Sequence, residues 1–429
     1  MKRYSRPPEK DWVALTKRPS SQNKDLDDIV RKIVNDVKIR GDKALFEYSG
    51  KLDNASLTSL KVPDEEIVDA SEQVSHGLKK AIDTARKNID KFHAAQAITE
   101  PAMETTPGVR CWRKNIPIEK VGLYVPGGSA PLFSTVLMLG IPAVIAGCNR
   151  IIVCTPPDRS GKANPVILYT CSILGIREIY VAGGAQAIAA MAFGTESVPA
   201  VNKIFGPGNQ YVTRAKEIVM EGGVAIDMPA GPSEVLVIAD KDADPEFIAS
   251  DLLSQAEHGP DSQVILLTDD EGLVPEVERE INLQLEILPR KGIAQEALSH
   301  SRSVVLDSLE KCVDFSNLYA PEHLIINTVN PQLIAEKVKN AGSVFLGKYS
   351  CESAGDYASG TNHTLPTNGF AVSYSGVSTE SFMKRITYQE ISFGGINSIG
   401  PAIMEMAEAE SLLAHKNSVS IRLKNRNNV

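Results

Sequence analysis

The chain has 429 residues, with 45 Lys and Arg against 53 Asp and Glu, so its formal net charge is −8. This balance lacks the excess of positive charge that broad contact with a phosphate backbone needs, and no nucleic-acid partner is expected. Hydrophobic residues make up 43% and charged residues 23% of the chain. These fractions are typical of folded proteins, exclude disorder over most of the length, and at about 150 residues per domain favour two or three domains.

The sequence favours a cytoplasmic protein with reduced thiols and no membrane partner. No window reaches the ~18 consecutive apolar residues of a membrane span, and the longest apolar stretch, from Val136 to Cys148, contains glycines and a proline. The opening segment MKRYSRPPEKDW has no apolar region behind its charges, so no secretory signal is expected. The six cysteines are scattered without a CxxC pair, and we expect them to pack rather than form disulfides or act as nucleophiles.

The first part of the chain, to about Gln96, is predicted to be mostly helical. An amphipathic run opens at Asp25 and stops near Gly41. A second run starts at Pro63, a favourable first helical position, and continues at helical spacing to Phe92. Three histidines in charged helical surroundings are expected to be solvent-exposed; they are His76, His93 and His300.

From Val121 onward, short apolar strands alternate with helical runs. Four βα units have strands at 121–128, 150–157, 178–184 and 203–209, and a second set has strands at 234–240, 262–268, 303–307, 323–327 and 343–347. This alternation predicts an α/β protein with two parallel-sheet domains that resemble Rossmann folds. The last fifty residues are predicted to form a small separate unit, with a helix around 403–413 and a possible short strand at Val419–Leu423.

Every strand of the first set ends in Gly or Pro, as in Gly183-Gly-Ala-Gln and Gly206-Pro-Gly-Asn. Open parallel sheets bind ligands at the carboxyl ends of their strands, where glycine admits a phosphate, so a nucleotide-like ligand is one interpretation. The other is that turns between strands and helices are rich in glycine anyway. GxGxxG and Walker A motifs are absent, so a dinucleotide would not bind in the ordinary Rossmann manner. Side chains near these strand ends that could reach it are Tyr124, Gln186 and Asn209.

The remaining four histidines lie in segments with acidic or amide neighbours. Gln255, His258, Asp356 and His415 would together make a nitrogen- and oxygen-rich zinc site if the fold gathers them. No HExxH or CxxC spacing supports this, and any one of these histidines taken alone is better explained as structural than as a ligand.

Glu322-His323 is the best acid–base candidate, because histidine titrates near neutral pH and an adjacent carboxylate can activate water. Neighbours within a strand would point to opposite faces, so the pair can act together only if it lies in the turn before the strand, as Pro321 indicates.

Eight long blocks of the sequence, taken together, resemble one known protein family. VGLYVPGGSAPLFSTVLM (121–138), GGAQAIAAMAFGT (183–195), KIFGPGNQYVTRAK (203–216), DMPAGPSEVLVIAD (227–240), SQAEHGPDSQVILLT (254–268), APEHLII (320–326), SAGDYASGTNHTLPT (353–367) and LLAHKNSVSIR (412–422) resemble histidinol dehydrogenase. The resemblance covers most of the chain from about residue 25, although residues 269–300 match no block. It implies NAD-dependent oxidation of L-histidinol to L-histidine through an aldehyde-level intermediate, the last steps of histidine biosynthesis.

The resemblance also implies roles for individual residues. His323 would take the protons of both oxidations, and Glu322 would activate water. One zinc ion per subunit would be held by Gln255, His258, Asp356 and His415. The further substrate contacts would be Ser233, His363 and Glu410, and the NAD contacts Tyr124, Gln186 and Asn209.

The resemblance further implies an intertwined homodimer with shared active sites. We expect an N-terminal segment at 1–24, an α/β domain from 25–120 with 234–377, an incomplete NAD-binding domain at 121–233, and a dimer-swapped segment at 378–429. Two other functions stay open from the residues alone: a related enzyme acting on another polar alcohol, and a two-domain binding protein without catalysis.

Overall fold

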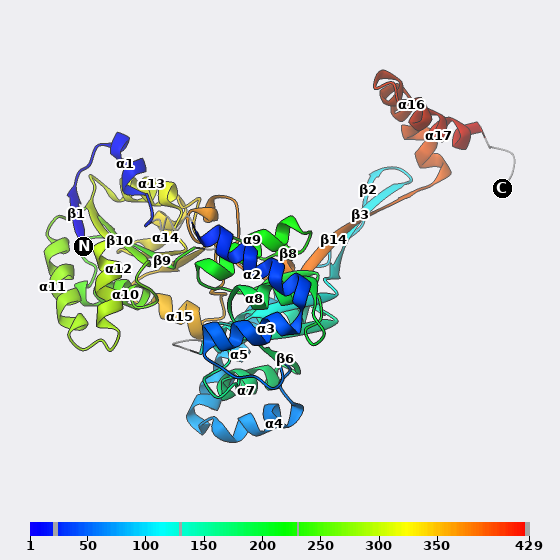
Figure 1. Cartoon of the computed structure of the whole chain (residues 1–429). Coiled ribbons are helices and arrows are strands. Elements are labelled where there is room, and N and C mark those ends of the chain that lie inside the picture. Colours follow the sequence, from blue (N-terminus) through cyan, green and yellow to red (C-terminus); the bar gives the residue numbers. More distant parts are fainter. Residues whose placement is uncertain (20–24, 128–130, 230, 425–429) are drawn as a thin grey trace. The chain divides into compact units, whose positions relative to one another are not determined.

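The computed structural model describes residues 1–19, 25–127, 131–229 and 231–424 (Figure 1). The chain forms two compact units, one made of Met1–Gln96 with Ile118–Phe382 and the other of Ala97–Pro117 with Met383–Val429. Among the described residues, no helix has both the length and the apolar character needed to cross a bilayer.

The first unit contains a five-stranded parallel sheet in the order β6-β5-β4-β7-β8. Its strands are β4 (Lys120–Tyr124), β5 (Arg150–Thr155), β6 (Glu178–Val181), β7 (Lys203–Phe205) and β8 (Ala225–Ile226). The connecting helices are α6 (Ser134–Ala146), α7 (Pro165–Ile173), α8 (Gly184–Phe193) and α9 (Gln210–Glu221). The strand order reverses between β4 and β7, which creates the switch point where doubly wound sheets bind ligands.

A six-stranded parallel sheet in the same unit has the order β1-β11-β10-β9-β12-β13. Its strands are β1 (Lys2–Ser5), β9 (Glu234–Ala239), β10 (Gln263–Thr268), β11 (Arg302–Val305), β12 (His323–Asn327) and β13 (Ser343–Leu346). Its helices are α1 (Trp12–Leu15), α10 (Pro245–Ala256), α11 (Leu273–Leu285), α12 (Lys291–Ser299), α13 (Leu309–Tyr319), α14 (Pro331–Ala335) and α15 (Glu352–Tyr357). Every residue of β9, β10 and β12 is buried, which explains their continuous apolar sequences. The predicted α/β class with two parallel sheets is confirmed.

The N-terminal helices are α2 (Leu26–Arg40), α3 (Asp42–Tyr48), α4 (Asp64–Gln73) and α5 (His76–Ala94). The predicted second helical run is therefore two helices, because Ser75 caps α5 by accepting a hydrogen bond from the Leu78 amide. Helix α2 packs against α8 and α9 (Figure 1). Helix α5 packs against α6. These helices thus bury their apolar faces against elements of the five-stranded sheet, whereas we expected residues 25–120 to accompany 234–377.

The prediction that His93 is exposed is wrong. Its side chain is fully buried, with Nδ1 2.9 Å from the carbonyl oxygen of Ile89 and Nε2 3.2 Å from Nδ2 of Asn362. The imidazole is tolerated in the core because both ring nitrogens have polar partners.

The second unit contains an antiparallel sheet in the order β14-β3-β2, formed by β2 (Met103–Thr106), β3 (Val109–Pro117) and β14 (Met383–Ile391). Two helices follow, α16 (Phe393–Ala409) and α17 (Leu413–Lys424), and they pack against each other (Figure 1). The possible strand at Val419–Leu423 is wrong, because these residues belong to α17.

Candidate active site

Glu322 and His323 lie together at the amino end of β12. Glu322 occupies the bend before the strand and His323 is its first residue, so the condition for the pair to act together is met. Glu322 Oε2 is 3.6 Å from His323 Nδ1, and both side chains are buried. The preceding helix α13 ends at Ala320 in the left-handed conformation, φ 51°, which turns the chain sharply before this pair.

The main chain of Glu234, the first residue of β9, contacts both side chains. Its amide donates to Glu322 Oε2 at 2.8 Å, and its carbonyl oxygen lies 3.2 Å from His323 Nδ1. His323 Nδ1 therefore carries a hydrogen and donates to that carbonyl. Nε2 is the basic nitrogen, and it lies 3.5 Å from Oδ1 of Asp356.

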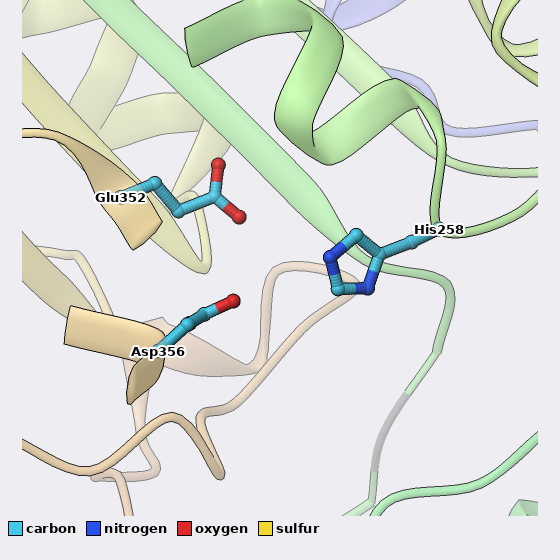
Figure 2. Close-up of side chains that lie close together, drawn as sticks. All are labelled: His258, Glu352 and Asp356. Carbon is cyan, nitrogen blue, oxygen red and sulfur yellow. The ribbon is translucent and has the colours of Figure 1, made fainter. Parts of the chain in front are cut away.

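A candidate metal site lies beside this pair. Glu352 and Asp356 are one helical turn apart on α15 and extend their carboxylates toward the ring of His258, which follows α10 (Figure 2). One ligand atom of each residue lies within 4.8 Å of those of the other two. Carboxylate oxygen and imidazole nitrogen are donors that zinc accepts.

Unpaired polar atoms at this place fit a bound cation. Gln255 is 1% exposed in α10, and its Oε1 has no hydrogen-bond partner among the described residues. The same holds for Asp356 Oδ1 and His323 Nε2. Buried acceptors left unpaired are costly, and a metal ion would satisfy those of Gln255 and Asp356.

The electrostatics of the site agree with this fit. Burial raises the pKa of both Glu322 and Glu352 to about 8. Burial acts to lower the pKa of His323, but the nearby carboxylates, Glu322 foremost, outweigh it and raise that pKa to about 10. The residue His258 is exposed, yet its ring is enclosed enough for desolvation to lower its pKa, which favours the neutral imidazole that binds metals.

The other expected substrate contacts fall in two places. Ser233 directly precedes Glu234 and is half-buried. His363 is held with Nδ1 3.1 Å from the carbonyl oxygen of Asp356, the residue opposite His323. Glu410 and His415 belong to the second unit, where both are exposed, and their part in the site stays a prediction.

The expected NAD contacts lie at the carboxyl ends of the five-stranded sheet. Tyr124 ends β4, and its buried hydroxyl accepts a hydrogen bond from the Gly184 amide at 3.0 Å. Gln186, in the first turn of α8, is 1% exposed and its Oε1 has no partner among the described residues. Asn209 caps α9, with Oδ1 accepting from the amides of residues 211 and 212. Their roles toward NAD stay predictions.

Glu352 is the site residue that sequence reasoning missed. A signal was present, because an acid four residues before Asp356 lies on the same face of a helix. The segment contains Gly355 and resembles a loop, so the sequence predicts no helix there.

Two doubly wound parallel sheets, one of them carrying a buried acid–imidazole pair beside a candidate metal site, define an α/β enzyme. Comparisons with known proteins identify the family of this enzyme. The family model described as histidinol dehydrogenase matches residues 16–423, and the chain belongs to the histidinol dehydrogenase family.

Full-length relatives agree. Histidinol dehydrogenase of Bacteroides thetaiotaomicron is 55% identical over 423 residues, 99% of each chain, and that of Salmonella typhimurium is 52% identical over 418 residues, 97% of this chain and 95% of the other. The crystal structure of histidinol dehydrogenase from Elizabethkingia anophelis is 59% identical, with a TM-score of 0.97 over 100% of this chain and 99% of that one. An acetylating aldehyde dehydrogenase from Geobacillus thermoglucosidasius, 14% identical with a TM-score of 0.50 over 89% of this chain and 94% of that one, shares the fold.

Proposed function

We propose that this chain oxidises L-histidinol to L-histidine in two NAD-dependent steps on a zinc-containing site. As a member of the histidinol dehydrogenase family it is an oxidoreductase of histidine biosynthesis. The observation that carries the proposal is the convergence of Glu322, His323 and Asp356 in one place, with Nδ1 of His323 engaged by the Glu234 carbonyl and Nε2 3.5 Å from Asp356 Oδ1.

In the first step the alcohol gives a hydride to NAD and a proton to the protein, which leaves an aldehyde. His323 would take that proton at Nε2, since its other nitrogen is engaged by the Glu234 carbonyl. A cation held beside it would offset the carboxylates that raise the His323 pKa to about 10, and so free Nε2 for this role. The imidazolium that forms is stabilised by the carboxylates of Glu322 and Asp356 on either side.

In the second step the aldehyde takes up water, and the hydrate gives a second hydride to NAD. Glu322 is the candidate base for this water. Its buried position keeps its pKa high enough, about 8, for the carboxylate to accept a proton near neutral pH.

Gln255, His258 and Asp356 would hold the zinc ion, and Glu352 lies within the same group of ligand atoms. Bound zinc would orient the amino and imidazole nitrogens of the substrate and offset the negative charge of the buried carboxylates. The family resemblance adds His415 of the partner subunit as the fourth ligand and Glu410 of the partner subunit as a substrate contact.

Tyr124, Gln186 and Asn209 would contact NAD at the switch point of the five-stranded sheet, where a dinucleotide has access to helix N-termini. Ser233 and His363 would contact the substrate beside the acid–imidazole pair.

The decisive experiment mixes the purified protein with L-histidinol and NAD and follows reduced nicotinamide by absorbance, with zinc measured before and after a chelator. We expect two NAD molecules reduced per histidinol, histidine as product, and loss of turnover with the metal. No reduction of NAD by the zinc-loaded protein would exclude the proposal, and a marked preference for another amino alcohol would favour a related enzyme.

A further inference from the structure

Arg18, in the N-terminal segment that the proposed reaction does not use, reaches the main chain that carries Glu322 and His323. Its Nε and Nη2 donate to the two carboxylate oxygens of Glu234 at 2.7 and 2.9 Å. The same Nη2 donates to the carbonyl oxygens of Tyr319 and Ala320 at 2.6 and 3.3 Å. The guanidinium thus joins the start of β9 to the turn before β12.

The Arg18–Glu234 ion pair is largely buried and makes further contacts. The Arg18 side chain is 16% exposed and that of Glu234 is 2% exposed. The Arg18 guanidinium carbon lies 3.9 Å from the centre of the Tyr319 ring, a cation–π contact. Glu234 Oε1 also accepts a hydrogen bond from the amide of Asn368 at 2.9 Å, so a second segment besides that of Arg18 is attached to this carboxylate.

The Arg18–Glu234 ion pair is linked to Glu322 and His323 through the main chain of Glu234. The main chain of Glu234 holds Glu322 through its amide and His323 through its carbonyl, while its side chain holds Arg18. Arg18 in turn fixes Ala320, whose φ of 51° is a conformation that alanine adopts at a cost. Without the guanidinium, the turn could relax and shift both side chains relative to β9.

Resting on the proposed function, we infer that Arg18 is a positioning residue, which acts through Glu234 to hold Glu322 and His323 in their reactive arrangement. A planar, bidentate guanidinium is the group suited to this, since one Arg side chain binds a carboxylate and two carbonyls at once. The N-terminal segment is therefore part of the active-site framework.

The test compares Arg18→Met with Arg302→Met. Arg302 also binds the N-terminal segment, through the carbonyl oxygens of Leu15 and Lys17, but among the described residues it makes no hydrogen bond to the turn before β12. We expect Arg18→Met to lower kcat for histidinol about 10- to 100-fold, with zinc content and the KM for NAD within twofold of wild type. Arg302→Met should keep kcat within threefold.

Two further variants separate positioning from folding. Arg18→Ala should regain at least tenfold in kcat with added ethylguanidinium, and Glu234→Gln, which keeps the main-chain bonds but loses the charge, should lose less than Arg18→Met. If Arg18→Met does not fold, Arg18→Lys and the rescue of Arg18→Ala decide the matter.

A readout independent of turnover is the ¹⁵N spectrum of histidine-labelled protein, with the His323 signals identified from His323→Asn. We expect Arg18→Met to move the Nδ1 and Nε2 shifts of His323 away from their wild-type values, because the Glu234 carbonyl no longer holds the ring in one position. Unchanged shifts together with wild-type kcat in folded Arg18→Met would overturn the inference. Wild-type protein that does not oxidise histidinol would exclude the proposed function separately, and the ¹⁵N shifts would still test the positioning.

Discussion

The amide of Glu234 donates a 2.8 Å hydrogen bond to Oε2 of Glu322, across the pairing of β9 with β12. A carboxylate proposed to activate water is thus held by the main chain of the neighbouring strand. Because a main-chain donor survives side-chain substitution, changes at Glu322 test its chemistry while the rest of this framework stays in place.

Replacing His323 with Asn should lower kcat for histidinol about 100- to 10,000-fold, because the group that accepts the protons is lost. Zinc content and the KM for NAD should remain near wild type. Steady-state kinetics at saturating NAD measure the effect, with His76→Asn, at an exposed helix start, as the matched control. Turnover within tenfold of wild type would show that another group takes the protons.

Glu322→Gln should separate the two oxidations. We expect turnover of histidinaldehyde to histidine to fall about 100-fold or more, while oxidation of histidinol to the aldehyde falls much less, since only the second step needs activated water. Single-turnover assays on each substrate provide the comparison. Exposed Glu310, which pairs with Lys337, gives the control Glu310→Gln. Equal losses in both steps would argue against the water-activating role.

The metal group predicts the effect of Glu352→Gln on zinc. If Glu352 shares the cation with His258 and Asp356, its neutralisation should weaken zinc binding about 10- to 100-fold, the range for groups that support a metal site. Competition with a chromogenic chelator measures the affinity without reference to turnover. The matched control is Glu257→Gln, one residue before His258; unchanged affinity in Glu352→Gln would place Glu352 outside the site.

Asp53 predicts a pH-dependent stability. Burial raises its pKa from 3.8 to about 6, and its Oδ2 has no hydrogen-bond partner among the described residues. The folded state therefore binds the Asp53 proton more tightly than the unfolded state does. The bound proton stabilises the fold fully below about pH 4, and this stabilisation is lost as the pH rises through about 6.

Asp53→Asn should accordingly be more stable than wild type at pH 7.5 by about 1–2 kcal/mol, a value reduced for the partial exposure of the side chain, with little difference at pH 4. Urea unfolding at the two pH values measures this. Asp69→Asn, on the exposed face of α4, should show no such pH-dependent gain. A gain equal at both pH values would contradict the titration of Asp53.

The proposal that two subunits share each active site predicts complementation. His415→Ala and His323→Ala should each be inactive alone. When they are co-expressed, half of the dimers are mixed and each mixed dimer has one intact site, so about a quarter of wild-type turnover should return. Activity of the co-expressed pair no higher than either variant alone would mean that each chain supplies its own His415.

Much of the fold could be predicted from the sequence because its signals are local. Strands such as 234–240 and 262–268 are apolar runs buried on both faces. Glycine-rich turns mark the ends of first-set strands such as 178–184 and 203–209. The helices before Gln96 were also predicted, but the sheet they pack on depends on contacts such as α2 with α8, which no local pattern encodes.

The errors arise where distant segments meet. The buried state of His93 depends on the side chain of Asn362, which is 269 positions away in the chain. Glu352 joins the site because α15 forms in a segment that reads as a loop. The acid–imidazole pair was found from sequence because Pro321 marks a turn, yet it lies at the amino end of the sheet, the edge opposite to the one that the rule for open sheets favours.

Strand β1 pairs with β11 at the edge of the six-stranded sheet, and the chain continues from it to Arg18. The opening residues are therefore an integral part of the fold. Affinity tags or fusions attached ahead of Met1 will lie next to a paired strand. Removing the first nineteen residues for crystallisation or expression would remove Arg18, the residue inferred to position Glu322 and His323. Preparations with a clipped leading end would lack this strand and Arg18, so an intact-mass measurement belongs beside every activity assay.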